Sequence, residues 1–598
     1  MARAPSDGIA RRDFLNGLLI AAGGSAVAGG APTRALATLA GGSCDGPIGL
    51  DPRALRGGNL PSTFTVSHWL RDGRLRFEKG SVALAPGCDE SAGPFPIVDE
   101  SAGFDAIVTG GGLSGLSSAH HLLRERPRAR LLILEAAPVL GGNAGRDEAP
   151  PLPGPASTAG AYGTAPSADW LAQFYRAIGV DWPAQSVPGP ESSFYFDEFA
   201  PGAIAGARGW NIDTFDRGAA RLPYDARLRD DFARAFETIR ALGEKGVSDP
   251  ADESDPALDD LSTVSLAHHL ERALGCDPIV SRFFTAYTLT AFGGTAEQVN
   301  AHSAIAFLSG ELTRGSVFTY PGGVSEIARR ALHRLAQSET PPRLETNATA
   351  LRIDPLSSDA RAGASVVYFQ NGAFRRVAAR QVILAAPAQS ARHLVAHFSD
   401  PARTEAWSRF HAAPIVTANV TLRRAAPLLA LGLGYSQSWW GGRHFVNYIV
   451  ADWMSATRAD PQRTTTLTFY GGCDAPLEAL GEARLTLLHT PFSDYEDSIR
   501  SDLTRLMRGA DFDFDRDVGA LFVYRWGHSM LRPPPDFLFG AKRDAGGRLD
   551  RAQGPRRIAC APLGPVVFAG QHVEGAPSVE SAIGSGRRAA RQALEHDR

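Results

Sequence analysis

The stretch Asp105-Ala-Ile-Val-Thr-Gly110-Gly-Gly112-Leu-Ser-Gly115 decides the fold of this chain. It joins an apolar strand-like segment, Phe104–Thr109, to a segment with helical spacing, Leu113–Glu125, through the pattern GxGxxG. Gly110 permits a tight turn, Gly112 lets backbone N–H groups approach a pyrophosphate, and Gly115 lets the helix pack close to the strand. The phosphate then lies at the helix N-terminus, where unpaired N–H groups attract an anion. We expect a cofactor-binding turn formed by Gly110, Gly111, Gly112, Leu113, Ser114 and Gly115.

A second apolar strand, Arg130–Glu135, follows and ends in a carboxylate. Glu135 stands twenty residues beyond Gly115, where it can accept hydrogen bonds from a ribose, so the segment predicts a dinucleotide site. A glycine pair, Gly141-Gly142, comes next and leads to Arg146. Such a loop places further backbone N–H groups against the diphosphate, which favours FAD over NAD.

This segment resembles the flavin amine oxidase superfamily, and four further segments resemble it in the same order. They are Tyr320-Pro-Gly-Gly323, Leu344–Ile353, Val382–Pro387, and Phe568-Ala-Gly570-Gln571 with Ser578-Val579-Glu580 up to Gly586. The resemblance implies that the backbone at Ala350 contacts the adenine side. It also implies that Gly570, Gln571, Ser578 and Val579 lie at the ribityl and pyrimidine end. The family usually has an acidic residue where this chain has Gln571, and glutamine can still hydrogen-bond a ribityl hydroxyl.

The order of these segments predicts an α/β fold in which a Rossmann-type FAD-binding domain of the amine oxidase type is interrupted by a mixed α+β substrate domain. The expected cofactor-domain parts are 101–160, 316–402 and 559–598, and the expected substrate-domain parts are 161–315, mostly helical, and 403–558. Residues 38–100 are expected to form an N-terminal arm with one short helix around Val66–Arg71. Within the second substrate part, Arg484–Leu488 is expected to be a strand.

The first residues, 1–37, are interpreted as a twin-arginine signal peptide. Arg11-Arg12-Asp13-Phe14-Leu15 is followed by a short, weakly apolar run and by a small-residue cleavage site at Ala35-Leu36-Ala37. The run is shorter than the roughly 18–20 apolar residues that span a bilayer, so we expect no stable membrane span. The expected location is periplasmic or secreted.

Both ends of the chain resemble bacterial spermidine dehydrogenases more closely. The matching segments are Arg11–Gly17, Leu55–Gly57, Phe64–Gly73, His489–Leu503 and Val523–His528. The resemblance implies oxidation of the C–N bond of an amine or polyamine by hydride transfer to flavin N5, followed by hydrolysis of the imine. The amine must be neutral when it reacts, and a desolvated aromatic pocket favours that form.

Trp526 and His528 are the catalytic candidates, because both lie in a matching segment that follows a strand. Other candidates for aromatic walls are Trp439, Trp440, Tyr448 and Trp453, each of which core packing would also explain. Many amine oxidases use a lysine near the flavin, but this chain has only Lys79, Lys245 and Lys542, none in a matching motif. We therefore expect a dehydrogenase that uses an electron acceptor other than O₂.

Spermidine dehydrogenases of this type can also carry a b-type haem. His68 lies in the matching N-terminal segment and is the expected protein ligand; a surface or helix-capping histidine is the alternative. The substrate is expected to be a small-molecule amine. The net charge of −3 gives no polyanion-binding balance, which argues against a nucleic-acid partner. The sequence indicates no oligomeric state.

Two alternatives to an amine-oxidising enzyme stay open. A desaturase of the phytoene-desaturase kind shares the glycine and closing motifs, but it would have a long apolar tunnel in place of a short aromatic pocket with a carboxylate at its far end. A non-catalytic binding protein on the same fold, as in Rab GDP-dissociation inhibitors, would have less need for export in the folded state.

Overall fold

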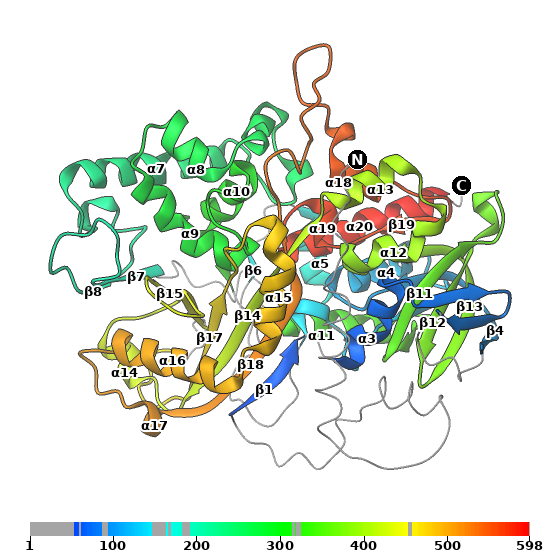
Figure 1. The fold of residues 1–598 in the computed structure, drawn as a ribbon, viewed down its shortest axis with the longest axis horizontal. Coiled ribbons are helices and arrows are strands. Elements are labelled where there is room, and N and C mark those ends of the chain that lie inside the picture. Colours follow the sequence, from blue (N-terminus) through cyan, green and yellow to red (C-terminus); the bar gives the residue numbers. More distant parts are fainter. Residues whose placement is uncertain are drawn as a thin grey trace.

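The computed structural model describes residues 53–58, 61–85, 94–145, 163–164, 169–181, 192–313, 317–318, 324–452 and 457–596. Within these residues the chain forms two large sheets and a helical region, with the helices α7–α10 and the second sheet on one side of the molecule and the first sheet with its helices on the other (Figure 1). The predicted α/β class is confirmed. No helix among the described residues is long and apolar enough to cross a membrane.

The first sheet has a parallel centre that carries the glycine turn. Its parallel strands, in spatial order, are β10 (Arg343–Glu345), β5 (Leu131–Leu134), β4 (Phe95–Thr109), β13 (Ala373–Leu384) and β19 (Val566–Phe568). The first half of β13 continues into an antiparallel extension with β12 (Ala364–Gln370) and β11 (Ala348–Pro355), while β2 (Leu75–Glu78) and β3 (Ser81–Leu84) join the start of β4. Helices cover both faces of the parallel centre, and its strand segments are therefore apolar there: Ala106–Val108, Leu131–Leu134, Val382–Leu384 and Val566–Phe568.

Helices from distant parts of the chain cover this sheet. One face packs against α4 (Leu113–Glu125), α5 (Asp169–Ala177), α11 (Val324–Ala336) and α20 (Val579–His596). The other face packs against α12 (Ala388–Val395), α13 (Pro401–Ser408), α18 (Pro555–Cys560) and α19 (Gln571–Glu574). The helix predicted at Leu113–Glu125 is confirmed by α4. The packing brings the N-terminal residues of α4 and α20 to the same end of the sheet.

The second sheet has eight strands. Their order is β1 (Arg53–Gly58), β18 (Val518–Arg532), β14 (His411–Leu422), β17 (Thr465–Gly471), β16 (Asn447–Val450), β15 (Ser436–Trp439), β7 (Ser192–Phe196) and β8 (Gly209–Asn211). The helices beside it are α14 (Ala426–Ala430), α15 (Leu480–His489), α16 (Phe492–Leu506) and α17 (Phe514–Asp517). A separate two-stranded sheet pairs β6 (Gly163–Thr164) with β9 (Val317–Phe318).

The strand predicted at Arg484–Leu488 is wrong, because these residues lie in the helix α15. Leu480 and Leu487, the buried residues of this helix, are seven positions apart, which is two helical turns. Arg484 donates hydrogen bonds to the carbonyl groups of Gly527 on β18 (3.0 Å) and of Ala412 on β14 (2.5 Å). The helix agrees with the helix propensity of leucine, and the hydrogen bonds of Arg484 fix it against the sheet.

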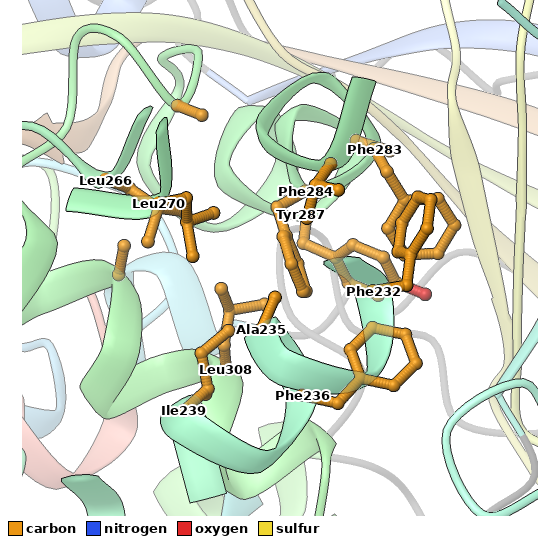
Figure 2. Packing of buried hydrophobic residues seen from close by; sticks show 14 of the residues in the cluster. Phe232, Ala235, Phe236, Ile239, Leu266, Leu270, Phe283, Phe284, Tyr287 and Leu308 are labelled. Atoms are coloured by element: carbon orange, nitrogen blue, oxygen red, sulfur yellow. The ribbon is translucent and has the colours of Figure 1, made fainter. Parts of the chain in front are cut away.

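The helical region is built around an aromatic core. Its helices are α7 (Ala226–Glu244), α8 (Leu266–His268), α9 (Pro278–Phe292) and α10 (Ala301–Glu311), and a π-helical turn, His269–Ala273, continues α8. Figure 2 shows Phe232 and Phe236 of α7 facing Phe283, Phe284 and Tyr287 of α9. This core packs the helices of the region against one another.

The segment predicted as an N-terminal arm contributes to both sheets where it is described. β1 pairs in parallel with β18. The helix α3 (Pro61–Arg71) confirms the short helix expected around Val66–Arg71, and its Val66 and Trp69 pack against Phe369 and Phe374 of the first sheet. The helix α3 therefore packs on the first sheet.

Candidate active site

A cavity of about 1780 Å³ lies where the two sheets and the helical region meet. Its walls include the glycine turn, the N-terminal residues of α20, the ends of α9 and α10, and one stretch of β18, Trp526–Leu531. Pockets for a single drug-sized ligand measure roughly 300–1,000 Å³. The cavity therefore has room for a dinucleotide together with a second molecule.

The glycine turn presents bare backbone to this cavity. Gly110 has a φ of +116°, and a side chain there would lie 2.7 Å from the carbonyl oxygen of Ala385. A side chain at Gly115 would lie 2.0 Å from the carbonyl oxygen of Gly110, so only glycine lets α4 pack this close to β4. Gly112 lines the cavity as the N-cap of α4 and, having no side chain, leaves the first N–H groups of the helix uncapped. These groups can receive an anion.

Glu135 and the glycine pair complete this end of the cavity. The Glu135 carboxylate accepts hydrogen bonds from the N–H groups of Gly111 (2.7 Å) and Ala137 (2.8 Å). Burial raises the pKa of Glu135, and these hydrogen bonds oppose the rise. The N–H of Gly141 donates to the carbonyl of Gly111 (2.9 Å), and a side chain at Gly142 would lie 3.1 Å from Cα of Gly112. The two glycine loops therefore touch through their backbones.

The closing segment lies opposite the glycine turn. Ser578 and Val579 start α20 and line the cavity, and the Ser578 hydroxyl accepts a hydrogen bond from the N–H of Ser581 (2.9 Å). Gly570 has a φ of +136°, and its N–H donates to the hydroxyl of Ser585 (2.9 Å). Gln571 donates its side-chain amide to the carbonyl of Ser529 (3.0 Å), which ties the segment to β18.

The described residues predicted to bind the cofactor fall into two groups. Those that line the cavity are Gly110, Gly112, Leu113, Ser114, Glu135, Gly141, Gly142, Ala350, Gly570, Gln571, Ser578 and Val579. Gly111 and Gly115 lie behind this surface, where the first binds Glu135 and the second packs the helix on the strand. Arg146 and the segment Tyr320–Gly323 lie outside the described residues. Bare backbone, an uncapped helix N-terminus and the volume of the cavity together fit an extended diphosphate-containing group such as FAD.

The catalytic candidates lie on β18, where the cofactor loops meet the second sheet. Ser529 accepts the hydrogen bond from Gln571, and its hydroxyl bonds to the side-chain amide of Asn143 (3.1 Å). The adjacent His528 and the nearby Trp526 both line the cavity. Burial and neighbouring positive charges lower the pKa of His528 well below its usual value. A neutral imidazole thus faces the cavity beside the cofactor loops.

A second part of the cavity combines aromatic rings with a carboxylate, Glu311 at the end of α10. The Tyr435 hydroxyl donates to Glu311 (3.3 Å), and Tyr287 lies near enough for Glu311 to raise its pKa. The aromatic side chains that line the cavity here are Tyr287, Phe292, Phe307 and Tyr470. The arrangement suits a molecule with an apolar body and a positive end.

The sequence did not single out these residues. Of its own aromatic candidates, Trp526 lines the cavity, and the other described ones do not. Trp439 and Tyr448 are fully buried in the core of the second sheet, and Trp440 packs against the helical core. Trp453 lies outside the described residues. Of the two explanations open for Trp439, Trp440 and Tyr448, core packing is the one that the structure supports, because none of the three lines the cavity. The sequence signal that could have identified this part of the cavity is Glu311, an acidic residue at the end of an otherwise apolar helix.

His68, in the last turn of α3, also lines the cavity and is half-buried. Burial, followed by the charge of Arg71, lowers its pKa to about 4. Among the described residues, no group of three or more histidine, cysteine, aspartate or glutamate side chains could hold a metal ion. Haem ligation by His68 stays a prediction.

Comparisons with known proteins agree with this geometry. A family model described as flavin containing amine oxidoreductase matches residues 113–594. No curated protein sequence gives a significant match. Solved structures with a similar fold include putrescine oxidase bound to putrescine (16% identity, TM-score 0.58, covering 83% of this chain and 99% of that one). Cyclohexylamine oxidase from Brevibacterium oxydans IH-35A (17%, 0.58, 83% and 100%) and an oxidoreductase from Methanosarcina mazei (14%, 0.54, 81% and 99%) are also similar.

Proposed function

The chain belongs to the flavin-containing amine oxidoreductase family, and we propose that it is a FAD-dependent enzyme that oxidises a C–N bond of an amine or polyamine. One observation carries the proposal. The glycine turn, a set of aromatic side chains and Glu311 all line a single cavity, so one ligand can lie between a bound dinucleotide and a carboxylate.

The residues that would hold FAD follow from the walls of the cavity. The N-terminal N–H groups of α4, from Leu113 and Ser114, would bind the diphosphate, and Glu135 would bind a ribose. Ala350 lies near Glu135 in the cavity wall and would face the adenine. Gly570, Gln571, Ser578 and Val579 would lie at the flavin end, next to β18. Bound FAD supplies the acceptor for the hydride that leaves the carbon next to nitrogen.

The protein itself must position the amine and keep its reacting nitrogen neutral. Glu311 would hold a second, non-reacting ammonium group at the far end of the pocket, with its apolar body between Tyr287 and Phe307. The reacting nitrogen would then lie near His528, whose neutral ring can accept a hydrogen bond from it. The positive charges around His528 disfavour an ammonium ion there, which leaves the neutral amine. Oxidation gives an imine, and water hydrolyses the imine to a carbonyl compound and a free amine.

The same walls argue against a desaturase. A polyene in this cavity would bury Glu311 and the positive groups near His528 against hydrocarbon, which costs several kcal/mol per unpaired charge. Among the described residues that line the cavity, none is a lysine. This supports a dehydrogenase that passes electrons to an acceptor other than O₂.

The proposal includes export through the twin-arginine pathway, supported by Arg11-Arg12 and the cleavage site near Ala37. A haem bound by His68 stays an expectation, and a Soret band in the absorption spectrum of the purified protein would test it.

Replacement of Glu311 tests the proposed function directly. The variant Glu311→Gln removes the charge but keeps the shape, so the KM for a diamine rises by roughly 10- to 100-fold while kcat changes less. Anaerobic flavin reduction by putrescine and spermidine is the measurement. The matched control is Glu339→Gln, because Glu339 is exposed and lies outside the cavity. Equal KM values in the two variants would contradict the role of Glu311, and a protein without flavin would contradict the whole proposal.

A further inference from the structure

One end of the cavity is strongly basic. Six side chains from four elements meet there and all line the cavity: His68 and Arg71 of α3, Arg392 and His393 of α12, Arg484 of α15, and His528 of β18. We refer to these six residues as the basic corner. Nothing in the glycine motifs requires them, since they lie outside the segments that carry the dinucleotide signature.

Electrostatic effects show that the six groups are close together. The pKa of His528 is lowered by burial and by the charges of Arg484, Arg71 and Arg392, which lie within electrostatic reach of the ring. The Arg392 Nε lies 3.3 Å from the His393 Nε2. The amide of Gln389 on α12 donates to the carbonyl of His528 (3.2 Å), which holds α12 against β18.

The positive charge of the basic corner exceeds the negative charge that it meets. Its three guanidinium groups face one carboxylate among the described residues that act on it, Asp72, which is paired with Arg71 at 2.8 Å. Burial and the nearby arginines lower the pKa of both His68 and His393 to about 4, so the histidines add no charge at neutral pH. Three positive charges less one negative charge leave a net charge of +2.

Arg392 is the arginine of this group with the fewest partners. Burial and the charge of Arg71 lower its pKa, and no ion pair with a carboxylate is found for it among the described residues. Arg484, by contrast, is anchored by the carbonyl groups of Gly527 and Ala412. A half-buried guanidinium without a counterion is costly, and a bound carboxylate would relieve that cost through two parallel hydrogen bonds.

We propose that the basic corner binds the α-carboxylate of the substrate, and that the substrate is an amino acid whose side chain carries a second positive charge. This inference rests on the proposed function and narrows its substrate class. The carboxylate would face Arg392 and Arg71, the α-amine would lie near His528, and the side-chain ammonium would reach Glu311 in the aromatic pocket. A simple diamine would fill the same pocket but leave the basic corner without its anion.

The reaction on such a substrate balances with the bound flavin alone. The Cα–H bond would break and its electron pair would pass as hydride to the flavin, the nitrogen would lose a proton to water, and the C=N bond of an imino acid would form. Water then adds to the imine and gives a 2-oxo acid and ammonia. One substrate is oxidised by two electrons and one flavin is reduced by two.

Matched pairs of ligands test the inference, because lysine and cadaverine, like ornithine and putrescine, differ only by the carboxylate. Anaerobic flavin reduction is expected at lower concentrations of lysine than of cadaverine. In Arg392→Gln the KM for lysine should rise by roughly 10- to 100-fold, and the KM for cadaverine should rise much less. Arg128→Gln is the control, because Arg128 is exposed and outside the cavity. Arg71→Gln is a second variant in case Arg392→Gln does not fold.

Calorimetric titration of each protein with lysine and with cadaverine measures binding without turnover. If lysine binds more tightly than cadaverine and this difference is lost in Arg392→Gln, the inference is supported, even if no amine reduces the flavin. A failure of every amine to reduce the flavin would refute only the proposed function. Reduction by cadaverine at the same or lower concentration, with Arg392→Gln unchanged for both ligands, overturns the inference and leaves the proposed function intact. A Soret band that is lost in Arg392→Gln also overturns it, because the propionates of a haem would then occupy the basic corner.

Discussion

The replacement Gly112→Ala separates the cofactor role of the glycine turn from its structural role. Gly112 has a φ of −73°, which alanine adopts without strain, and the nearest atom to an added Cβ is Cα of Gly142 at 3.7 Å. The methyl group therefore fits the protein itself. It would stand beside the backbone of Gly141 and Gly142, which with Gly112 line the part of the cavity where a diphosphate would lie. We expect the FAD-free variant to unfold with nearly the same free energy as the unaltered protein, within about 0.5 kcal/mol.

The affinity for FAD should fall because the methyl group occupies the space of the phosphate. An extra methyl group in a filled site costs about 1–3 kcal/mol, which corresponds to roughly a 5- to 150-fold rise in Kd. At an FAD concentration of about 100 times the normal Kd, bound FAD stabilises the unaltered protein by about 2.7 kcal/mol. With a Kd about 100-fold higher, the same concentration stabilises the variant by only about 0.4 kcal/mol.

Flavin fluorescence quenching measures the Kd, and urea denaturation with and without FAD measures the stabilisation. Gly115→Ala is the comparison, because its Cβ would lie 2.0 Å from a backbone oxygen and α4 would have to move away from β4. That variant should lose about 3 kcal/mol of stability even without FAD. If Gly112→Ala binds FAD as tightly as the unaltered protein, the diphosphate does not cross this turn and the reasoning fails.

Two further predictions concern buried carboxylates in the FAD-free protein. In Glu135→Gln an amide nitrogen replaces one of the oxygens that accept hydrogen bonds from Gly111 and Ala137. Urea denaturation should therefore show a loss of about 1–3 kcal/mol in the free energy of unfolding. An unchanged denaturation midpoint would refute the hydrogen bonds described for this side chain. Burial and the charge of Glu580 raise the pKa of Asp249 to about 7, so this group stabilises the fold at low pH and loses that contribution as the pH rises through 7. Asp249→Asn should therefore lose less stability than the unaltered protein between pH 5 and pH 8, by at most about 2.7 kcal/mol in urea titrations, and parallel pH profiles would count against it.

The predictable parts of the fold are those whose structure is determined by interactions within a short segment of sequence. The turn at Gly110–Gly115 requires glycine because other backbone segments approach it too closely for a side chain. The helix Leu113–Glu125 follows from the helical spacing of its apolar residues. The structure contains both as expected. The strand predicted at Arg484–Leu488 failed because its helical form depends on carbonyl groups of β14 and β18 that are distant in sequence.

The substrate pocket was less predictable for the same reason. Glu311, Tyr287 and Tyr470 come from separate elements, and no motif links them. Trp439 and Tyr448 looked equally suitable in the sequence, yet both face the core of the second sheet. Which aromatic ring faces a cavity depends on how sheets and helices pack.

The sequence by itself determined the dinucleotide turn, the family and the flavin chemistry that the family implies, because backbone approach to a diphosphate is set within a few consecutive residues. Only the tertiary structure decided that Glu311 and the basic corner line the same cavity. The residues from His68 to His528 span most of the chain, and their charges act on one another only after folding brings α3, α12, α15 and β18 together. Coulomb interactions depend on distance in space, which the order of residues does not specify.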